Sequence, residues 1–364
     1  MFKTRHYVPI LKWKKGEYTA LAEIDQDARS KLTPLIEIPQ IPYDFVNEVP
    51  ARTINQHLEK VTQQISESWG IKSHFFLDLL RINPDERMEN KEHPLAFLAN
   101  DARQKKLKMI PITELDKDEE YQAQIKKINL QDENGICLRI YRDDFGDAKL
   151  LEDGLNRLMK FLETNYENVD LILDLEYIPP EYEKMIMDFL PATINSIPNL
   201  NNWRTFTFVA TSFPEYLIDI APNSINAIRR SEWHIWNYLL KSKINRKPSF
   251  GDYVIAYPKI TEIDPRVMKV SANIRYTTDN DWLIFRGSNL KREGYDQFHD
   301  LSHVVVNHRN YSGEEFSSGD LFIKKCANRK VTPGSLTTWR RVGTNHHLTF
   351  VANQITSLAI SDET

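Results

Sequence analysis

Short apolar runs alternate with longer segments of helical periodicity along residues 1–260. Each run has the length of a buried strand and lacks a strict apolar–polar alternation, which is typical of parallel strands covered by helices. The runs are Tyr7–Leu11, Thr33–Ile38, His74–Leu80, Met109–Glu114, Ile136–Tyr141, Val169–Leu175, Thr205–Thr211 and Tyr253–Tyr257. The candidate helices between them are Glu17–Ala28, Thr53–Trp69, Pro94–Lys106, Glu119–Ile128, Leu151–Thr164, Glu181–Ile197 and Ser224–Leu240.

This rhythm restricts the fold to the α/β class. Strands that alternate with helices form right-handed crossovers, which build either a closed barrel or an open doubly wound sheet. Eight runs favour the barrel, and no Gly-x-Gly-x-x-Gly follows the first run, so the dinucleotide-binding fold lacks its best marker. We therefore predict a (β/α)₈ barrel of the TIM type.

The pattern changes after Tyr257. Asn273–Tyr276 and Trp282–Arg286 flank a polar turn and predict a β-hairpin. Helical patterns follow at Tyr295–Asn307, Phe316–Ala327 and Asn345–Ile355, and the loop Asn328–Gly343 separates the last two. We expect a barrel body at residues 1–260, a hairpin and helical insertion over one rim at 261–344, and the last barrel helix with a tail at 345–364. A small separate C-terminal domain is the alternative.

Composition bounds the class of protein. The chain has 364 residues, two cysteines and a formal net charge of −4. Two cysteines in buried-looking segments argue against a disulfide framework and favour a cytoplasmic protein. Neither a signal-peptide pattern nor an apolar stretch of about 18 residues is present, so we expect no membrane association. The interleaved charges argue against coverage of long nucleic-acid tracts, although a local basic groove stays open.

Several segments resemble one known family. They are Tyr7–Glu17, Pro34–Ile38, Ser249–Tyr253, Ala272–Tyr276, Trp282–Gly287 and Thr338–Leu348. They are similar to the bacteriophage "beta protein" family, and the resemblance covers almost the whole chain. It implies a protein of phages, prophages or satellite elements, with some members in gene clusters that act against competing phages, and a protein partner from the same gene module. The family has no settled catalytic assignment, so no active site carries over.

Charged or polar side chains recur near the carboxyl ends of the apolar runs. They are Lys12, Glu37, Asp78, Glu114, Arg139, Asp174 with Glu176, Thr211 with Ser212, and Tyr257. In a barrel these positions converge on the mouth where such proteins build their sites. We therefore expect one shared site there.

Three interpretations of this charged ring remain open. Glu37, Asp78, Glu114 and Asp174 could hold Mg²⁺ or Mn²⁺, with Lys12, Arg139 and Tyr257 facing a phosphate-bearing molecule or nucleic acid, for phosphodiester or nucleotide hydrolysis. The catalytic carboxylates, Glu176 included, could instead act as acid and base without metal. In the third interpretation, Lys12 and Arg139 simply neutralise the acids in a structural network.

Two other positions are candidates for the same site. His346 follows Thr344 and Asn345, which are good N-caps, so the sequence predicts a helix start where a histidine could serve as a catalytic acid or base; capping and packing is the alternative. Arg275 and Arg286 on the hairpin could bind an anion, or stabilise the hairpin only. Lys12–Lys15 is interpreted as a solvated basic loop. An interaction protein that controls an effector or toxin through its C-terminal extension is the rival function.

Overall fold

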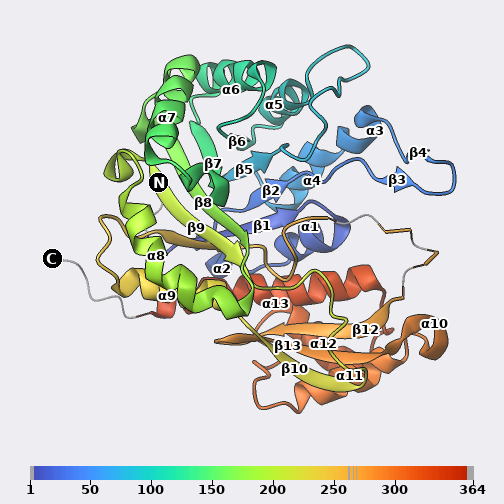
Figure 1. Ribbon diagram of the computed structural model, residues 1–364. Helices are drawn as coiled ribbons and strands as arrows, with labels where there is room; N and C mark the ends of the chain where they lie inside the picture. The colour runs from blue at the N-terminus through green and yellow to red at the C-terminus, as the bar shows by residue number, and fades with distance from the viewer. Residues whose placement is uncertain (1–3, 261–262, 265, 268, 359–364) are drawn as a thin grey trace.

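The computed structural model describes residues 4–260, 263–264, 266–267 and 269–358. Eight parallel strands close into a barrel in the order β1-β11-β9-β8-β7-β6-β5-β2 (Figure 1). They are β1 (Tyr7–Lys12), β2 (Leu35–Glu37), β5 (His74–Asp78), β6 (Lys108–Thr113), β7 (Ile136–Tyr141), β8 (Val169–Tyr177), β9 (Thr205–Thr211) and β11 (Ser249–Asp252). The predicted TIM-type barrel is confirmed, but its eighth strand is Ser249–Asp252, directly before the predicted run Tyr253–Tyr257.

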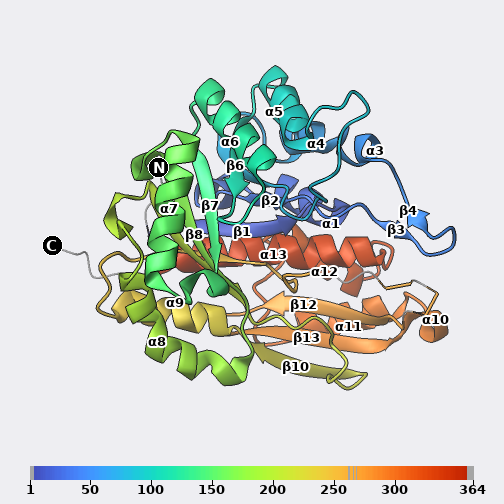
Figure 2. The same ribbon diagram turned by 45° about the horizontal axis from the view of Figure 1, so that its top comes forward.

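Helices follow the strands and cover the outside of the barrel. They are α1 (Lys15–Ala22), α2 (Gln26–Ser30), α3 (Ile54–Leu58), α4 (Val61–Ser68), α5 (Pro94–Gln104), α6 (Glu119–Asp132), α7 (Ala148–Leu162), α8 (Glu183–Asn195) and α9 (Ser231–Lys241). The last helix, α13 (Leu336–Ser357), follows β11 in the ring and packs against α1, α2 and β1. Figure 2 shows α13 lying between the barrel and the C-terminal sheet. None of the described helices is both long enough and apolar enough to cross a lipid bilayer.

The start of α13 differs from the prediction. The expected helix began near Asn345 after a loop that extended to Gly343, but the helix begins at Leu336 and Ser335 is its N-cap. The Ser335 side chain accepts a hydrogen bond from the backbone N–H of Thr338, and the hydroxyl oxygen of Thr338 accepts one from the backbone N–H of Ser335. This capping box explains the earlier start. Gly343 is retained inside the helix because a Cβ there would lie 2.8 Å from Ile255.

The predicted hairpin is confirmed as β12 (Ser271–Thr277) and β13 (Asp281–Asn289). A third strand, β10 (Ser224–Arg229), pairs antiparallel with β13 and completes the order β10-β13-β12. The predicted helix Ser224–Leu240 is therefore wrong in its first turns. Cross-strand pairing in the folded chain decides the structure of this segment against its helical periodicity.

Further short elements decorate this frame. Helices α10 (Leu290–Glu293), α11 (Gln297–Val306) and α12 (Ser318–Ala327) lie beside the C-terminal sheet, and β3 (Tyr43–Asp44) and β4 (Val49–Pro50) form a small hairpin after β2.

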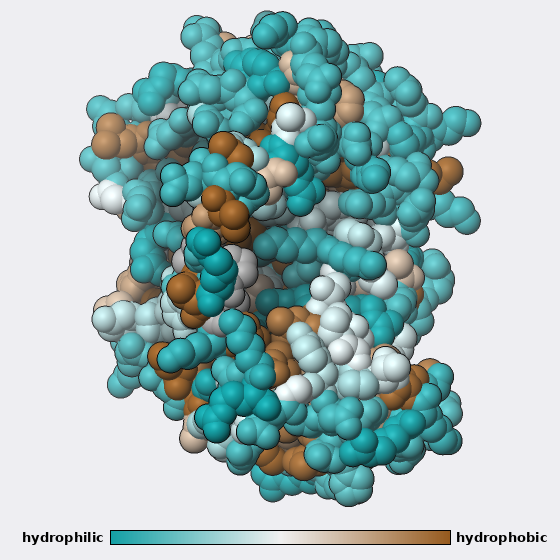
Figure 3. Space-filling view, turned by 90° about the vertical axis from the view of Figure 1, so that its right-hand side faces the viewer, coloured by the Kyte–Doolittle hydropathy of each residue, from teal (hydrophilic) through white to brown (hydrophobic). Residues whose placement is uncertain are grey.

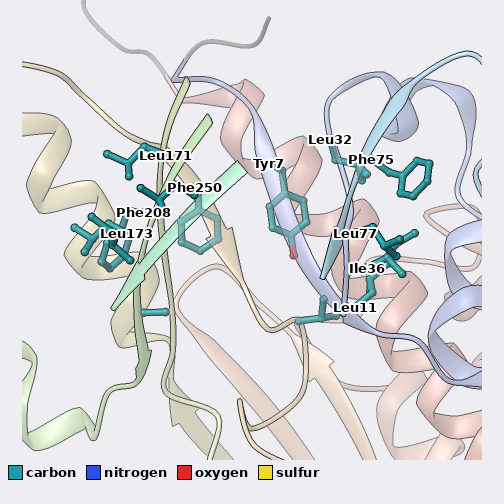
Figure 4. Close-up of a cluster of buried hydrophobic side chains, with 14 of the residues drawn as sticks. Tyr7, Leu11, Leu32, Ile36, Phe75, Leu77, Leu171, Leu173, Phe208 and Phe250 are labelled. Carbon is teal, nitrogen blue, oxygen red and sulfur yellow. The ribbon is translucent and has the colours of Figure 1, made fainter. Parts of the chain in front are cut away.

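Side chains alternate between the two faces of each barrel strand. One buried cluster fills the space between strands and helices, and Figure 4 shows some of its members, among them Ile36, Leu77 and Phe208. A second cluster fills the lumen and consists of Val8, Ile10, Leu35, Phe76, Ile110, Ile112, Cys137, Ile172, Val209 and Tyr253. The lumen is thus a packed core, as in other barrels of this class.

Candidate functional site at the barrel mouth

A polar layer lies on the lumen side above this apolar plug. The strand register pairs Lys12 with Glu37 and Glu37 with Asp78, so these three residues stand side by side on β1, β2 and β5. Each lies two residues beyond a lumen-facing apolar residue, and residues two apart in a strand point to the same face. The strand ends therefore deliver charged side chains to one level of the barrel.

Arg139 on β7 gathers three of the carboxylates. Its Nη1 lies 2.5 Å from Oδ2 of Asp78 and 3.3 Å from Oε2 of Glu37, and its Nη2 lies 2.6 Å from Oδ2 of Asp174. The hydroxyl of Tyr253 donates to Oδ2 of Asp174 at 2.6 Å and accepts from Nη2 of Arg139 at 2.6 Å. The predicted convergence of Glu37, Asp78, Arg139 and Asp174 is present.

These groups are sealed from solvent. The three carboxylates are 0% exposed and Arg139 is 1% exposed. The second oxygens of Asp78 and Asp174 accept from the backbone N–H groups of Leu80 and Glu176, both at 2.7 Å. Buried charges persist when they are paired and hydrogen-bonded in this way. The geometry of these residues is that of a neutralised network.

Glu37 is the carboxylate of this network that has one oxygen without a hydrogen-bond partner among the described residues. Its Oε1 is buried and has no hydrogen-bond partner among the described residues. Burial raises the pKa of Glu37, and the nearby charge of Asp78 acts in the same direction, whereas Arg139 opposes both. Glu37 is therefore the carboxylate of the network whose hydrogen bonding is incomplete among the described residues.

The arrangement does not support the four-carboxylate metal site. The guanidinium of Arg139 bonds the oxygens that would have to face a shared cation. Among the described residues, no group of three or more His, Cys, Asp or Glu side chains is placed to hold a metal ion. Glu114 follows β6, is half-buried and has its pKa raised by burial, but within the described chain its carboxylate accepts no hydrogen bond from the network.

Two further cations, the half-buried Arg81 and the buried Lys12, lie beside the network. Arg81, just after β5, lies 3.9 Å from Glu37 and 3.8 Å from Glu176, distances beyond a hydrogen bond, and its side chain is 31% exposed. Lys12 donates to the backbone oxygen of Tyr257 at 2.7 Å. Burial lowers the pKa of Lys12 to about 7, and the charge of Arg81 contributes in the same direction.

Two more arginines hold the segment after β11. Arg275 and Arg340 both donate to the backbone oxygen of Ile255, at 2.6 and 3.0 Å. This bond ties the hairpin to the segment after β11, and the predicted binding of an anion by Arg275 stays a prediction. Arg286 does not join them, because it donates instead to the backbone oxygens of Leu217 and Ile220. The anion-binding prediction for Arg286 has no support in this position.

His346 lies far from the role predicted for it. It is 0% exposed in the middle of α13, where Nδ1 lies 2.9 Å from Asp320 and Nε2 lies 2.9 Å from the backbone oxygen of Thr277. Its ring stacks on Tyr276 at 3.9 Å. His346 therefore has a packing role, which was the alternative interpretation. It was expected at a helix start facing the mouth, but the helix begins ten residues earlier, at Leu336.

A parallel network surrounds the next residue of the helix. His347 bonds Asp252 on β11 at 2.9 Å and the hydroxyl of Thr277 on β12 at 2.7 Å. Asp252 also accepts from the hydroxyl of Tyr7 on β1 at 2.6 Å. Burial lowers the pKa of His347. This buried chain of polar groups joins the barrel to the C-terminal sheet through α13.

Arg81 was missed by the sequence reasoning. Arg81 directly follows the apolar run His74–Leu80, so its place after a strand end is the signal that could have found it.

Fold and mouth together define a TIM-type (β/α)₈ barrel protein with a layered charged cluster at the carboxyl ends of its strands. The chain belongs to the Beta protein family, whose model matches residues 7–353. Among solved structures it is similar to triosephosphate isomerase from Bartonella henselae, with 9% sequence identity, a TM-score of 0.33, and coverage of 68% of this chain and 92% of that chain. No curated protein matches the sequence.

Proposed function

We propose that the barrel mouth binds the oxyanion of a phosphate-bearing ligand through Arg81 and Lys12. The observation that carries this proposal is that the hydrogen-bond donors of Arg81 are unused within the described residues. Within the described residues its guanidinium donates no hydrogen bond, although it lies beside two carboxylates at a polar mouth. A planar guanidinium presents five donors in a geometry that matches an oxyanion.

The surrounding charges support the same ligand class. Lys12 lies close enough to both Arg81 and Arg340 for their charges to lower its pKa, and burial makes the electrostatic effect of a charged Lys12 stronger than it would be in water. Neither of the carboxylates nearest to Arg81 accepts a hydrogen bond from it. Glu37 accepts one from Arg139 instead, and Glu176 lies 3.8 Å from Arg81. An oxyanion would therefore replace two long contacts with direct hydrogen bonds.

The family supplies the biological setting of this proposal. On the resemblance described above, we propose that the chain acts in a gene module by which a phage or prophage competes with other phages. We propose that its ligand takes part in that competition. The four-carboxylate hydrolysis mechanism is not carried forward, because Arg139 already bonds three of the required ligands.

Sulfate tests this site, because its charge stays constant between pH 6 and pH 9. We expect Arg81→Ala to weaken sulfate binding by about tenfold or more, since hydrogen bonds to charged groups contribute roughly 1.5–3 kcal/mol each. Binding to the wild type should weaken as pH rises through about 7, where Lys12 loses its proton, and Lys12→Met should remove that pH dependence. Isothermal titration calorimetry at constant ionic strength measures both effects.

The matched control is Arg292→Ala, which removes an exposed arginine on α10. It should bind sulfate as the wild type does. Equal affinities of Arg81→Ala and the wild type would refute the proposed site.

A protein partner is the second candidate function, and β10 favours it. β10 lies at the edge of the C-terminal sheet, and in the described chain only β13 pairs with it. Its side chains are exposed or half-buried, and Ile225 is 46% exposed. Open strand edges accept a strand from another chain.

The test uses Ile225→Lys, since a lysine on an edge strand opposes pairing. The product of a neighbouring gene should co-purify with the wild type and at least fivefold less with this variant. Leu130→Lys, at a 56% exposed position on α6, is the control, and the neighbouring gene's product should co-purify with it as strongly as with the wild type. Undiminished capture by Ile225→Lys would exclude the β10 edge as the interface.

A further inference from the structure

A cavity of about 520 Å³ lies beside the mouth, where the chain leaves β1 and β2. This volume falls within the roughly 300–1,000 Å³ of small-molecule pockets. Figure 3 faces the side of the molecule that carries β3 and β4, and this surface is hollowed near its centre. The lining residues that carry the argument are four aromatic side chains, Trp13, Tyr18, Tyr43 and Phe45, and four cations, Lys14, Lys15, Arg52 and Lys60.

Among the described residues that line this cavity, the charged side chains are all cations. None of the described residues that line it is acidic. In the part of the chain that the structure describes, the side chains of Lys15 and Arg52 form neither a hydrogen bond nor an ion pair, and Lys60 has only Glu59 at 3.9 Å. Cations without partners around a concave surface attract an anion, because low-dielectric walls focus their field.

The aromatic residues form two pairs on separate segments. Trp13 and Tyr18, from the β1–α1 region, have ring centroids 5.6 Å apart, and Tyr43 and Phe45, from the β3–β4 hairpin, have centroids 5.2 Å apart. A planar aromatic ligand gains from such faces, since stacking on aromatic side chains suits every nucleobase. Cations and aromatic rings in one cavity match a ligand with both a phosphate and a base.

The walls of the cavity are fixed by contacts between elements. The indole N–H of Trp13 donates to Gln64 on α4 at 3.1 Å. The ring of His57 on α3 lies 2.7 Å from the backbone oxygen of Pro39, and burial lowers the pKa of His57. A preformed pocket avoids the entropy cost of ordering its walls when the ligand binds.

We propose that this cavity binds a mononucleotide, with the base among the aromatic side chains and the phosphates on Arg52, Lys60 and the neighbouring lysines. The limited volume of the cavity and the net charge of −4 favour a single nucleotide over a nucleic-acid strand. The site is independent of the Arg81 site, because none of its lining residues belongs to the charged network at the centre of the mouth.

Calorimetry with ATP, adenosine and inorganic tripolyphosphate separates the two halves of the ligand. The wild type should bind ATP at least tenfold more tightly than either fragment. The double variant Arg52→Glu/Lys60→Glu should weaken ATP and tripolyphosphate binding by tenfold or more and leave adenosine binding unchanged. Phe45→Ala should weaken ATP and adenosine binding by about fivefold or more and spare tripolyphosphate.

Lys126→Glu, at a surface ion pair on α6, is the matched charge control and should bind ATP as the wild type does. Tripolyphosphate binding as tight as ATP would overturn the proposal, because the base would then contribute nothing. An oligonucleotide that binds more tightly than ATP through the same residues would overturn it in favour of a nucleic-acid site. Loss of ATP binding in Arg81→Ala, but not in the double variant, would move the nucleotide to the centre of the mouth. Failure of the sulfate test alone leaves this cavity unaffected.

Discussion

Replacing Arg139 with leucine is expected to lower the free energy of unfolding by about 3–5 kcal/mol, the range for breaking a buried ion pair by removing one partner. The reason is that Glu37, Asp78 and Asp174, all 0% exposed, lose the cation that neutralises them. Urea unfolding followed by circular dichroism measures the loss.

The loss in free energy of unfolding caused by Arg139→Leu should depend on pH. Without the guanidinium, which lowers the pKa of Glu37, burial and the charge of Asp78 raise that pKa further above its unfolded value. The contribution of Glu37 to stability is then present at low pH and lost as pH rises through its folded pKa. The variant should therefore be closer to the wild type at pH 5 than at pH 8.

Lys126→Ala is the control for this experiment, since Lys126 pairs with Glu163 at 2.7 Å on the surface, with side-chain exposures of 31% and 62%. Such surface pairs contribute about 0–1 kcal/mol. If Arg139→Leu loses no more stability than this control, the carboxylates do not depend on Arg139 and the network interpretation fails.

The second large effect is expected for Asp252→Ala. Removing this carboxylate leaves the hydroxyl of Tyr7, the Nε2 of His347 and the backbone N–H of Val254 without their acceptor inside the protein. Buried groups left unsatisfied cost about 1–3 kcal/mol each, so we expect a loss of about 3–5 kcal/mol. Asp252→Asn keeps one acceptor oxygen and should lose less.

Asp153→Ala, at an exposed position on α7, should stay within about 0.5 kcal/mol of the wild type. Asp252→Ala should also separate the unfolding of the C-terminal sheet from that of the barrel, because Asp252 anchors α13 to β11. If Asp252→Ala unfolds at the same urea concentration as the wild type, this network does not hold the barrel and the C-terminal sheet together.

Much of the fold could be predicted from the sequence, because the apolar runs report burial directly. The hairpin of β12 and β13 was also predictable from its aromatic strands and polar turn. β10 was not, since Ser224–Arg229 continues the helical periodicity of α9 and its partner β13 lies more than fifty residues further on. The start of α13 was missed because Gly343 and the polar residues before it resemble a loop.

The site shows the same division. The strand ends predicted that Glu37, Asp78 and Asp174 would meet, and they do, around Arg139. Whether they meet as metal ligands or as a neutralised network depends on where one guanidinium lies, which sequence spacing cannot specify. The cavity was missed because its aromatic and cationic residues come from segments that spacing does not connect, and Lys12–Lys15 alone resembles a solvated loop.

The pairing of β10 has a consequence for the protein during its synthesis. β10 leaves the ribosome between the seventh and eighth barrel strands, but its partner β13 emerges only later, and α13, which covers β1, emerges later still. The nascent chain must therefore carry an unpaired strand until β13 has emerged, and an uncovered barrel wall over β1 until α13 has emerged. Exposed strands and apolar faces of this kind attract chaperones and promote aggregation.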